Sequence, residues 1–307
     1  QGLLYATMGR YTQAEGFTAG ALDIRKETFG ENHIGMASSL NNYGVLHYNL
    51  GRYNEAEKTF ASAVSIVAAN QMKASMPYSI ILNNRAMLFQ AIGRFEEAVT
   101  SLKEAIDVAE KLQSKNSKNH LKFLSNLALL YQQMGKYAEA ESIYLGMETR
   151  LGKTNPDYAS MLSNQAALYM LMGKQDKVES LLKTASGIYK NSFGEENPAY
   201  AKVISDLGNF YRIGERYNEA LPLLEKALLI REKTLGRNHP HYVQSQEDLA
   251  IYYWKSNAHE KAYTLYQDLM TKSLEFINTY FPPMSEEEKK KNRDELEKTM
   301  ERSFFLF

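Results

Sequence analysis

The amino-acid sequence predicts an all-α fold, a right-handed superhelical solenoid of antiparallel helix hairpins. Three observations predict it. A short phrase recurs at a nearly constant interval, and the apolar residues on both sides of that phrase follow the helical period. The 307 residues also include only 7 prolines and 18 glycines, so few positions would interrupt long helices.

The recurring phrase is Gly-Arg-aromatic or a weaker form of it. Its third position falls at residues 11, 53, 95, 137, 175, 217 and 259. Every interval is 42 residues, except that the step from 137 to 175 is 38 residues. Self-similarity at a fixed period of this size is the signature of a repeat architecture. We therefore expect about seven repeats.

Each repeat is predicted to contain two helices. After the phrase, small or bulky apolar residues stand at helical spacing, as in Ala98, Leu102 and Ala105. A second apolar stripe precedes the phrase, as in Leu127 and Tyr131. The glycine between the two stripes is where the first helix ends and the chain reverses. Because neither helix can bury its apolar face alone, neighbouring hairpins are expected to stack.

One solenoid is expected to span residues 1–279. The chain opens at Gln1 in what reads as the middle of a helix, so the first repeat is predicted to be truncated. The 38-residue interval lacks about one helical turn. It predicts a short second helix in that repeat and a local change of curvature without a break. Residues 280–307 are expected to form a charged helix with an apolar end, a possible junction to a missing domain.

Composition excludes several kinds of site. The 36 basic residues balance 36 acidic ones, which argues against nucleic acid as a general partner. Without cysteine, disulfides, thiol nucleophiles and Cys-ligated metals are excluded in this segment. No apolar stretch approaches the ~18 residues that predict a membrane span. Nothing fixes the oligomeric state or the compartment, although the cytoplasm is slightly favoured.

The end of the second helix carries a further repeated pattern. LIREKTLG at residues 229–236 precedes NHP at 238–240, and IRKETFG at 24–30 and FGEENP at 193–198 are variants of it. Together with the 42-residue period, this pattern resembles the tetratricopeptide repeat of the kinesin-light-chain type, over roughly residues 1–275. The resemblance implies a scaffold that binds a protein or an extended peptide on its concave face.

The tail has a resemblance of its own. The segment from Tyr280 to Phe304 is similar to the junction that joins repeat arrays to a caspase-like CHAT peptidase domain in some bacterial proteins. This resemblance implies an alternative function, in which the chain is the sensor of a larger bacterial protein. The catalytic residues would then lie beyond Phe307.

A column of small polar residues marks the candidate binding site. Counting back nine residues from each turn gives one member per repeat: Asn42, Asn84, Asn126, Asn164, Asp206 and Asp248. Carboxamides both donate and accept hydrogen bonds, so the column could hold the backbone of an extended peptide. The kinesin-light-chain resemblance implies ligand contact for the four asparagines, and the two aspartates favour a basic ligand group nearby. Alternatively, the column bonds to the adjacent helix and holds the stack together.

The sequence shows no motif of an enzyme or of a cofactor site. His239 and His241 flank Pro240, but no acidic ligand accompanies them at a fixed spacing. His33 and His239 share a loop position, which favours a role in the repeat architecture. Phosphate-binding loops and nucleophile elbows are absent from the sequence. We therefore expect a non-catalytic chain without a cofactor.

Other polar and aromatic side chains need an explanation. Arg85 and Gln165 interrupt the apolar stripe of the first helices, where a polar group requires a partner. They could form a contact between repeats or deepen the groove, and the sequence does not choose. Tyr48 and Trp254 are further candidates for contact with a partner, with ordinary packing as the alternative.

Overall fold

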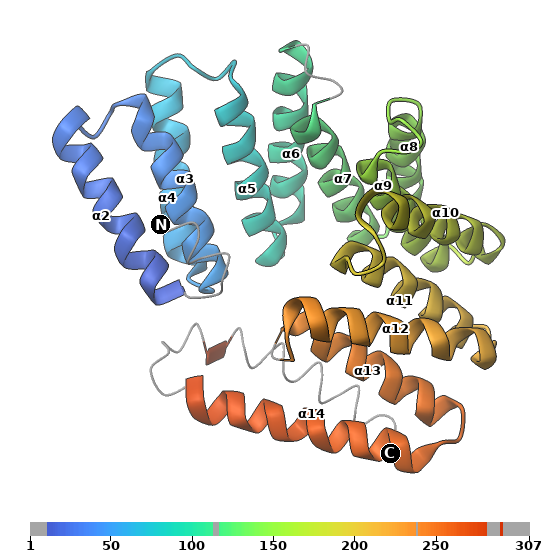
Figure 1. Cartoon of the computed structure of the whole chain (residues 1–307). Coiled ribbons are helices and arrows are strands. Elements are labelled where there is room, and N and C mark those ends of the chain that lie inside the picture. The colour runs from blue at the N-terminus through green and yellow to red at the C-terminus, as the bar shows by residue number, and fades with distance from the viewer. Residues whose placement is uncertain (1–10, 113–116, 238, 281–288, 291–307) are drawn as a thin grey trace. The chain divides into compact units, whose positions relative to one another are not determined.

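The computed structural model describes residues 11–112, 117–237, 239–280 and 289–290, and these form thirteen helices (Figure 1). The helices pack as consecutive hairpins, which confirms the predicted all-α repeat architecture. The first helices of the hairpins are α3 (Ile34–Asn49), α5 (Met76–Ala91), α7 (Lys118–Gln133), α9 (Pro156–Leu171), α11 (Pro198–Ile213) and α13 (Pro240–Lys255). The second helices are α2 (Tyr11–Phe29), α4 (Tyr53–Ala69), α6 (Phe95–Lys111), α8 (Tyr137–Glu148), α10 (Gln175–Phe193), α12 (Tyr217–Leu235) and α14 (His259–Tyr280).

Each second helix begins at the third position of the recurring phrase, as α4 does at Tyr53 and α6 at Phe95. The residue two positions earlier has a positive φ, 80° at Gly51 and 78° at Gly93, and also before α12 and α14, where it is Glu215 (58°) and Asn257 (63°). This left-handed conformation favours glycine, because a side chain there meets the backbone. The predicted reversal of the chain at this glycine is therefore confirmed.

The first helices are all 16 residues long, and their starts are fixed by side-chain caps. Ser75 and Asn197 accept a hydrogen bond from a backbone N–H of the first turn, as N-cap residues commonly do. His33 and His239 do the same with Nδ1, which accepts from Gly35 N and His241 N at 3.1 Å. The predicted architectural role of these two histidines is confirmed.

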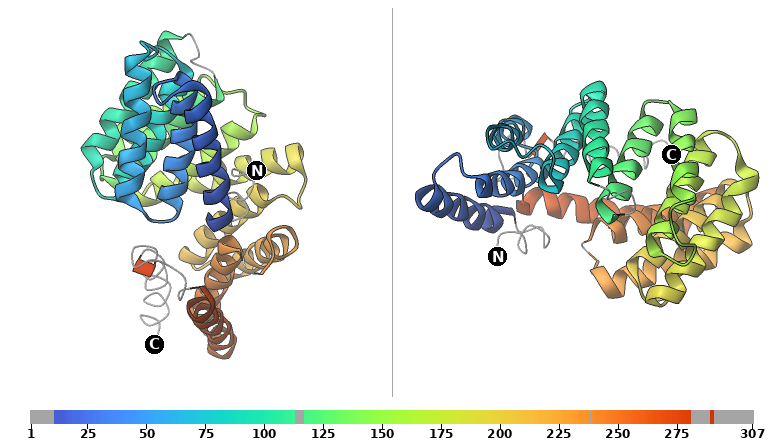
Figure 2. Two further views of the ribbon diagram at one scale, coloured as in Figure 1. Left: turned by 90° about the vertical axis from the view of Figure 1, so that its left-hand side faces the viewer. Right: turned by 90° about the horizontal axis from the view of Figure 1, so that it is seen from above.

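The 38-residue interval shortens one second helix, as predicted. Helix α8 has 12 residues, whereas α6 has 17 and α10 has 19. The chain divides within α8 into two compact units, residues 1–143 and 144–307. Figure 2 shows the hairpins within each unit side by side. A continuous solenoid over residues 1–279 stays a prediction, and the expected terminal helix and apolar end lie almost entirely outside the described residues.

The arginine of the recurring phrase connects neighbouring hairpins. Arg94 donates from Nη1 to Glu57 on the preceding second helix at 2.7 Å, and Arg216 reaches Glu179 in the same way at 2.6 Å. Each guanidinium also lies over an aromatic ring of its own hairpin, Phe89 at 4.4 Å for Arg94. The phrase therefore combines a turn, a helix start and a contact between repeats.

Small residues allow the helices to approach closely, as the sequence predicted. Ala63, Ala105, Ala185 and Ala227 are completely buried. In the first unit they pack with larger side chains such as Ile81 and Phe123. Since each hairpin buries its apolar stripe against the next, the fold leaves the polar column of the first helices at the edge of the core.

Candidate functional site

The six residues of the predicted column lie on the first helices and fall into three classes of exposure. Asn42 is exposed; Asn84, Asn126, Asn164 and Asp206 are half-buried; and Asp248 is buried. One turn further along, Val45 and Leu129 are half-buried and Met87 is exposed. The same helix face thus carries both polar groups and partly exposed apolar side chains.

In the first unit, the column is part of a chain of hydrogen bonds across three hairpins. Asn84 donates from Nδ2 to Oδ1 of Asn41 at 2.9 Å. Asn126 donates to Oδ1 of Asn83 at 2.7 Å, and Asn83 donates to Oδ1 of Asn84 at 3.2 Å. Asn84 and Asn126 therefore contact the adjacent repeat, as the structural alternative requires. Each carboxamide has further donor or acceptor capacity that could serve a ligand.

The second unit continues the same register with different chemistry. Ser205 Oγ donates to Oδ2 of Asp248 at 2.9 Å, so Ser205 takes the place that Asn41 and Asn83 hold in the first unit. Asp206 instead forms an ion pair with Lys202 at 2.8 Å within α11. The sequence analysis missed the inner partners Asn41, Asn83 and Ser205, although each directly precedes a member of the column.

A pocket of about 500 Å³ opens between helices α11, α12 and α13. It brings together two of the predicted site residues, Asp206 and Asp248. Its other polar lining residues include Lys202, Ser205, Asn209, Arg231, His241 and Gln244. The pocket thus offers hydrogen-bonding groups of both kinds and charges of both signs.

Arg231 is the most deeply buried cation of this pocket, with only 5% of its surface exposed. Its Nη1 donates to the backbone oxygen of His241 at 3.0 Å and to Ser245 Oγ at 2.6 Å. Burial lowers the pKa of the Arg231 guanidinium, and the charges of Asp248 and Asp206 oppose that shift. Burial, followed by the charge of Arg231, also lowers the pKa of His241, which disfavours its protonated form.

The burial of Asp248 predicts that the stability of the fold depends on pH. Burial raises its pKa above the ordinary 3.8, and hydrogen bonds from Ser205, Asn209 and Gln244 only partly offset this. The folded state therefore holds the Asp248 proton more tightly than the unfolded state does, and stability falls as pH rises through the folded-state pKa. We expect the Asp248→Asn variant to become more stable relative to the wild type, with a larger free energy of unfolding, as pH rises from below 3.8 to neutrality. Urea unfolding at a series of pH values measures this, and a difference that stays constant would contradict it.

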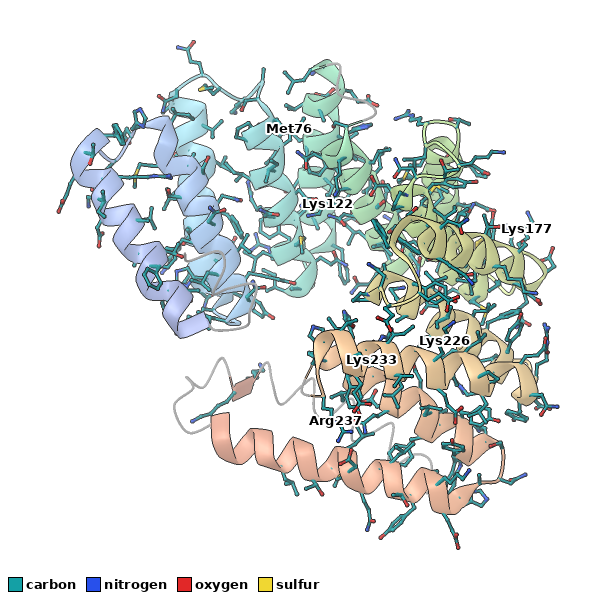
Figure 3. All side chains as sticks on the ribbon, viewed as in Figure 1. Met76, Lys122, Lys177, Lys226, Lys233 and Arg237 are labelled. Carbon is teal, nitrogen blue, oxygen red and sulfur yellow. The ribbon has the colours of Figure 1, made fainter. Side chains whose placement is uncertain are left out.

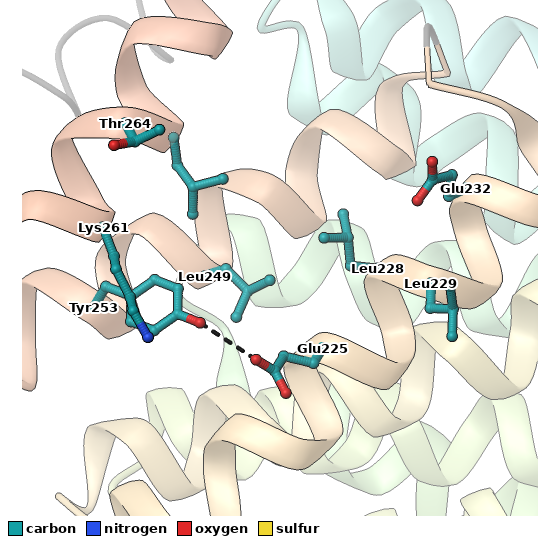
Figure 4. A pocket seen from close by; sticks show the side chains of 9 residues that line it. Glu225, Leu228, Leu229, Glu232, Leu249, Tyr253, Lys261 and Thr264 are labelled. Atoms are coloured by element: carbon teal, nitrogen blue, oxygen red, sulfur yellow. Dashed lines mark hydrogen bonds between the residues drawn. The ribbon is translucent and has the colours of Figure 1, made fainter. Parts of the chain in front are cut away.

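A second pocket, also of about 500 Å³, lies between α12, α13 and α14 (Figure 4). Leu228, Leu229 and Leu249 give it an apolar floor, and Tyr253 donates to Glu225 across it at 3.3 Å. No member of the predicted column lines this pocket. Beside this pocket on α12, Lys226 and Lys233 (Figure 3) form ion pairs with Glu195 and Glu196 of the loop after α10.

The polar residues on the apolar stripe contact their own helices. The Arg85 guanidinium lies 4.9 Å from the centre of the Phe89 ring. Gln165 is buried and donates to Tyr169 Oη at 3.4 Å. Both contacts span one helical turn. Tyr48 and Trp254 are half-buried, and their rings pack on Tyr53 and His259 respectively, as the packing alternative predicts.

Metal and membrane sites were also sought in the structure. In the described ranges, no group of three or more histidine, aspartate or glutamate side chains could hold a metal ion. None of the helices in those ranges combines the length and the apolar character needed to cross a bilayer.

Comparisons with known proteins identify the repeat. The tetratricopeptide repeat profile matches residues 1–69, 78–145 and 200–271, which is more than half of the chain. No curated protein matches the sequence significantly.

Several solved structures share the fold at low sequence identity. TPR-like repeats of a Podospora anserina kinesin light chain are 23% identical with a TM-score of 0.51, covering 65% of this chain and 95% of that one. The apo form of the quorum sensor NprR from B. thuringiensis is 14% identical with a TM-score of 0.56, covering 88% and 86%. The Rap conjugation gene regulator of plasmid pLS20, in complex with the Phr* peptide, is 14% identical with a TM-score of 0.58, covering 88% and 73%.

Proposed function

Because this chain belongs to the tetratricopeptide repeat family, we propose that it holds an extended peptide or protein segment rather than catalysing a reaction. The binding surface is the face formed by the first helices of its hairpins. The observation that carries the proposal is the pocket between α11 and α13, which contains Asp206 and Asp248 of the predicted column together with Asn209 and Gln244. Hydrogen-bonding side chains beside open space are what recognition of a peptide backbone requires.

Two further observations support this proposal. Asn42 and Asn164 have no side-chain hydrogen bond to any described residue, so neither is committed to the repeat interface. The Rap regulator with the same repeat fold is named for its complex with a peptide. The chain therefore has both free carboxamides and a fold that is used for peptide binding elsewhere.

The structure allows a sharper test than replacing the whole column. We expect the double change Asn42→Ala and Asn164→Ala to weaken peptide binding by about 1–3 kcal/mol, since two neutral hydrogen-bonding groups are lost. The melting temperature should stay nearly unchanged, because neither side chain bonds to a neighbouring hairpin. The probes are dodecapeptides selected from a random phage-displayed library on the wild-type chain, with affinities measured by isothermal titration calorimetry.

The matched control is Asn84→Ala, which removes an inter-repeat bond to Asn41. It should lower the melting temperature as well as the affinity, so it separates the two roles of the column. If the double variant binds every selected peptide as tightly as the wild type does, Asn42 and Asn164 do not contact the ligand and their part of the proposal is wrong. A library that yields no binders at all would refute peptide binding.

The tail favours a second candidate function. If residues 280–307 are the junction that their resemblance implies, the array senses a ligand and regulates a CHAT peptidase in a larger bacterial protein. A downstream His/Cys dyad in the complete coding sequence would support this candidate. A coding sequence without such a dyad would remove it and leave the binding scaffold as the function.

A further inference from the structure

The hairpin α13–α14 lacks the basic residue that the other hairpins carry at the second position of the recurring phrase. In α11–α12 this residue is Arg216, which lies over the Tyr211 ring at 4.2 Å and donates to Glu179 of the preceding second helix at 2.6 Å. Tyr211 Oη donates to the same carboxylate at 3.0 Å. In α13–α14 the basic residue is replaced by Ala258. Its backbone N–H still donates to the oxygen five residues earlier at 2.8 Å, as that of Arg216 does, so the turn itself is unchanged.

The tyrosine and the glutamate of this contact are nevertheless present in α13–α14. Tyr253 holds the equivalent position in α13 and donates from Oη to Glu225 of α12 at 3.3 Å (Figure 4). Glu179 forms ion pairs with both Arg216 and Lys183. Within the described ranges, by contrast, no cationic nitrogen lies within 4.0 Å of the Glu225 carboxylate. Glu225 therefore has a hydrogen-bond donor but no counter-charge.

Open space adjoins this carboxylate. The pocket of about 500 Å³ between α12, α13 and α14, called the α12–α14 pocket below, contains both Glu225 and Tyr253 among its lining residues. It also exposes apolar surface, since Leu229 in its wall is 51% exposed. Glu232, the other carboxylate of the pocket, is already paired with Arg237 at 2.6 Å. The groups without partners in the pocket are thus an apolar surface and one carboxylate.

The Tyr253 ring offers a further contact for a cation. It is half-buried, whereas the equivalent rings of Tyr169 and Tyr211 are only 3% and 4% exposed. Lys261 of the pocket lies 5.2 Å from the centre of the Tyr253 ring. One lysine does not saturate such a ring, because Tyr169 carries two, each at 5.4 Å. An aromatic face attracts cations, and a guanidinium can stack on it while its planar fork donates to a carboxylate.

We propose that the α12–α14 pocket binds an arginine side chain of a partner polypeptide, with an apolar residue of the partner next to it. The guanidinium donates to Glu225 and lies on the Tyr253 ring, and so replaces the arginine that this hairpin lacks. The apolar neighbour packs on Leu228 and Leu229. No member of the polar column lines this pocket, so the site goes beyond the proposed function and adds a contact that does not depend on the column.

A subtractive selection on the full chain isolates ligands of this pocket. Random decapeptides displayed on phage are first depleted on the Leu229→Lys variant and then selected on the wild type. Leu229 is exposed, and a lysine four residues after Glu225 on the same helix favours pairing with that carboxylate. The variant should therefore fold normally with its pocket occupied. The recovered peptides should be enriched in Arg over Lys, with Leu, Ile or Phe beside the arginine.

A double-mutant cycle then tests the proposed ion pair. Glu225→Gln should weaken the recovered peptides about 3- to 10-fold in isothermal titration calorimetry, as expected for a partly exposed charged hydrogen bond. Replacing the peptide arginine with glutamine should cause a similar loss. The two changes together should cost little more than either alone, because both remove the same contact. Glu196→Gln is the matched control, since this exposed glutamate lines neither pocket and its loss should leave the affinities unchanged.

The outcomes separate this inference from the proposed function. A recovered pool without arginine enrichment, or losses that add up in the cycle, would overturn the inference. Peptides held by the polar column bind Leu229→Lys as well as the wild type, so the subtraction removes them and neither result concerns them. If the arginine peptides are the only binders and bind the Asn42→Ala, Asn164→Ala double variant unchanged, the inference stands and the assignment of the column fails.

Discussion

Replacing Phe89 with alanine is expected to lower the free energy of unfolding by about 3–5 kcal/mol, the usual cost of truncating a fully buried aromatic side chain. Phe89 is 1% exposed and packs against Ala86, Leu102 and Leu130. Its ring is also the platform for the Arg94 guanidinium, which connects this hairpin to Glu57 of the preceding one. The change would therefore weaken both the core and a contact between repeats.

Urea unfolding followed by far-ultraviolet circular dichroism measures this loss. Phe193→Ala is the matched control, because that ring is 53% exposed and should change stability by no more than about 0.5 kcal/mol. Phe89→Leu keeps most of the apolar volume but removes the aromatic face, so its loss should be smaller. Similar losses for Phe89→Ala and Phe193→Ala would show that the Phe89 site is not a core position.

Most of the fold could be predicted because each hairpin repeats the same local rules. The aromatic position of the phrase gave the first residue of every second helix, including Gln175 and His259, where the aromatic itself is replaced. The missing turn was correctly placed in α8. Periodicity is sufficient for these features, since they depend on local turns and on nearest-neighbour packing.

The candidate site was harder to predict, because it depends on contacts between repeats. The prediction placed the column on the correct helices. Its hydrogen-bond partners Asn41 and Asn83 each directly precede a member of the column. A 42-residue period does not show which of two consecutive residues contacts the adjacent repeat. These hydrogen bonds determine which carboxamides remain available to a ligand. The assignment of the column as a ligand site stays a prediction.

Arg231 shows that a usable signal was nevertheless present. Comparing sister repeats identified Arg85 and Gln165 as polar departures from an apolar stripe. The same comparison along the second helices finds Arg25 and Arg231 at the position where other repeats have Val67, Ala109 and Tyr189. The partners of Arg231, which are His241 O and Ser245 Oγ, could not have been found that way, because they depend on side-chain contacts between hairpins.

Gly44→Ala is expected to destabilise the chain although it adds a better helix former within α3. A β-carbon at this position would lie 2.7 Å from Cε1 and 2.9 Å from Cδ1 of Phe60, a side chain that is only 1% exposed. Such overpacking typically costs about 1–3 kcal/mol. Exchanging Gly for Ala in a helix contributes about 1 kcal/mol in the opposite direction. The net loss of stability is therefore expected to be up to about 2 kcal/mol.

Gly187→Ala in α10 isolates the packing cost, because nothing lies within 4 Å of the added β-carbon there. Both variants share the helical gain, so Gly44→Ala should unfold about 1–3 kcal/mol more easily than Gly187→Ala in urea. Adding Phe60→Leu to Gly44→Ala should recover part of this difference, since two sister hairpins combine alanine with leucine at these positions, Ala86 with Leu102 and Ala166 with Leu182. If the recovery is absent, the clash with Phe60 is not the cause. In that case the two backbones would limit how closely α3 and α4 can approach. The need for small residues at this position of the repeat would then come from the spacing of the helices and not from the size of the facing side chain.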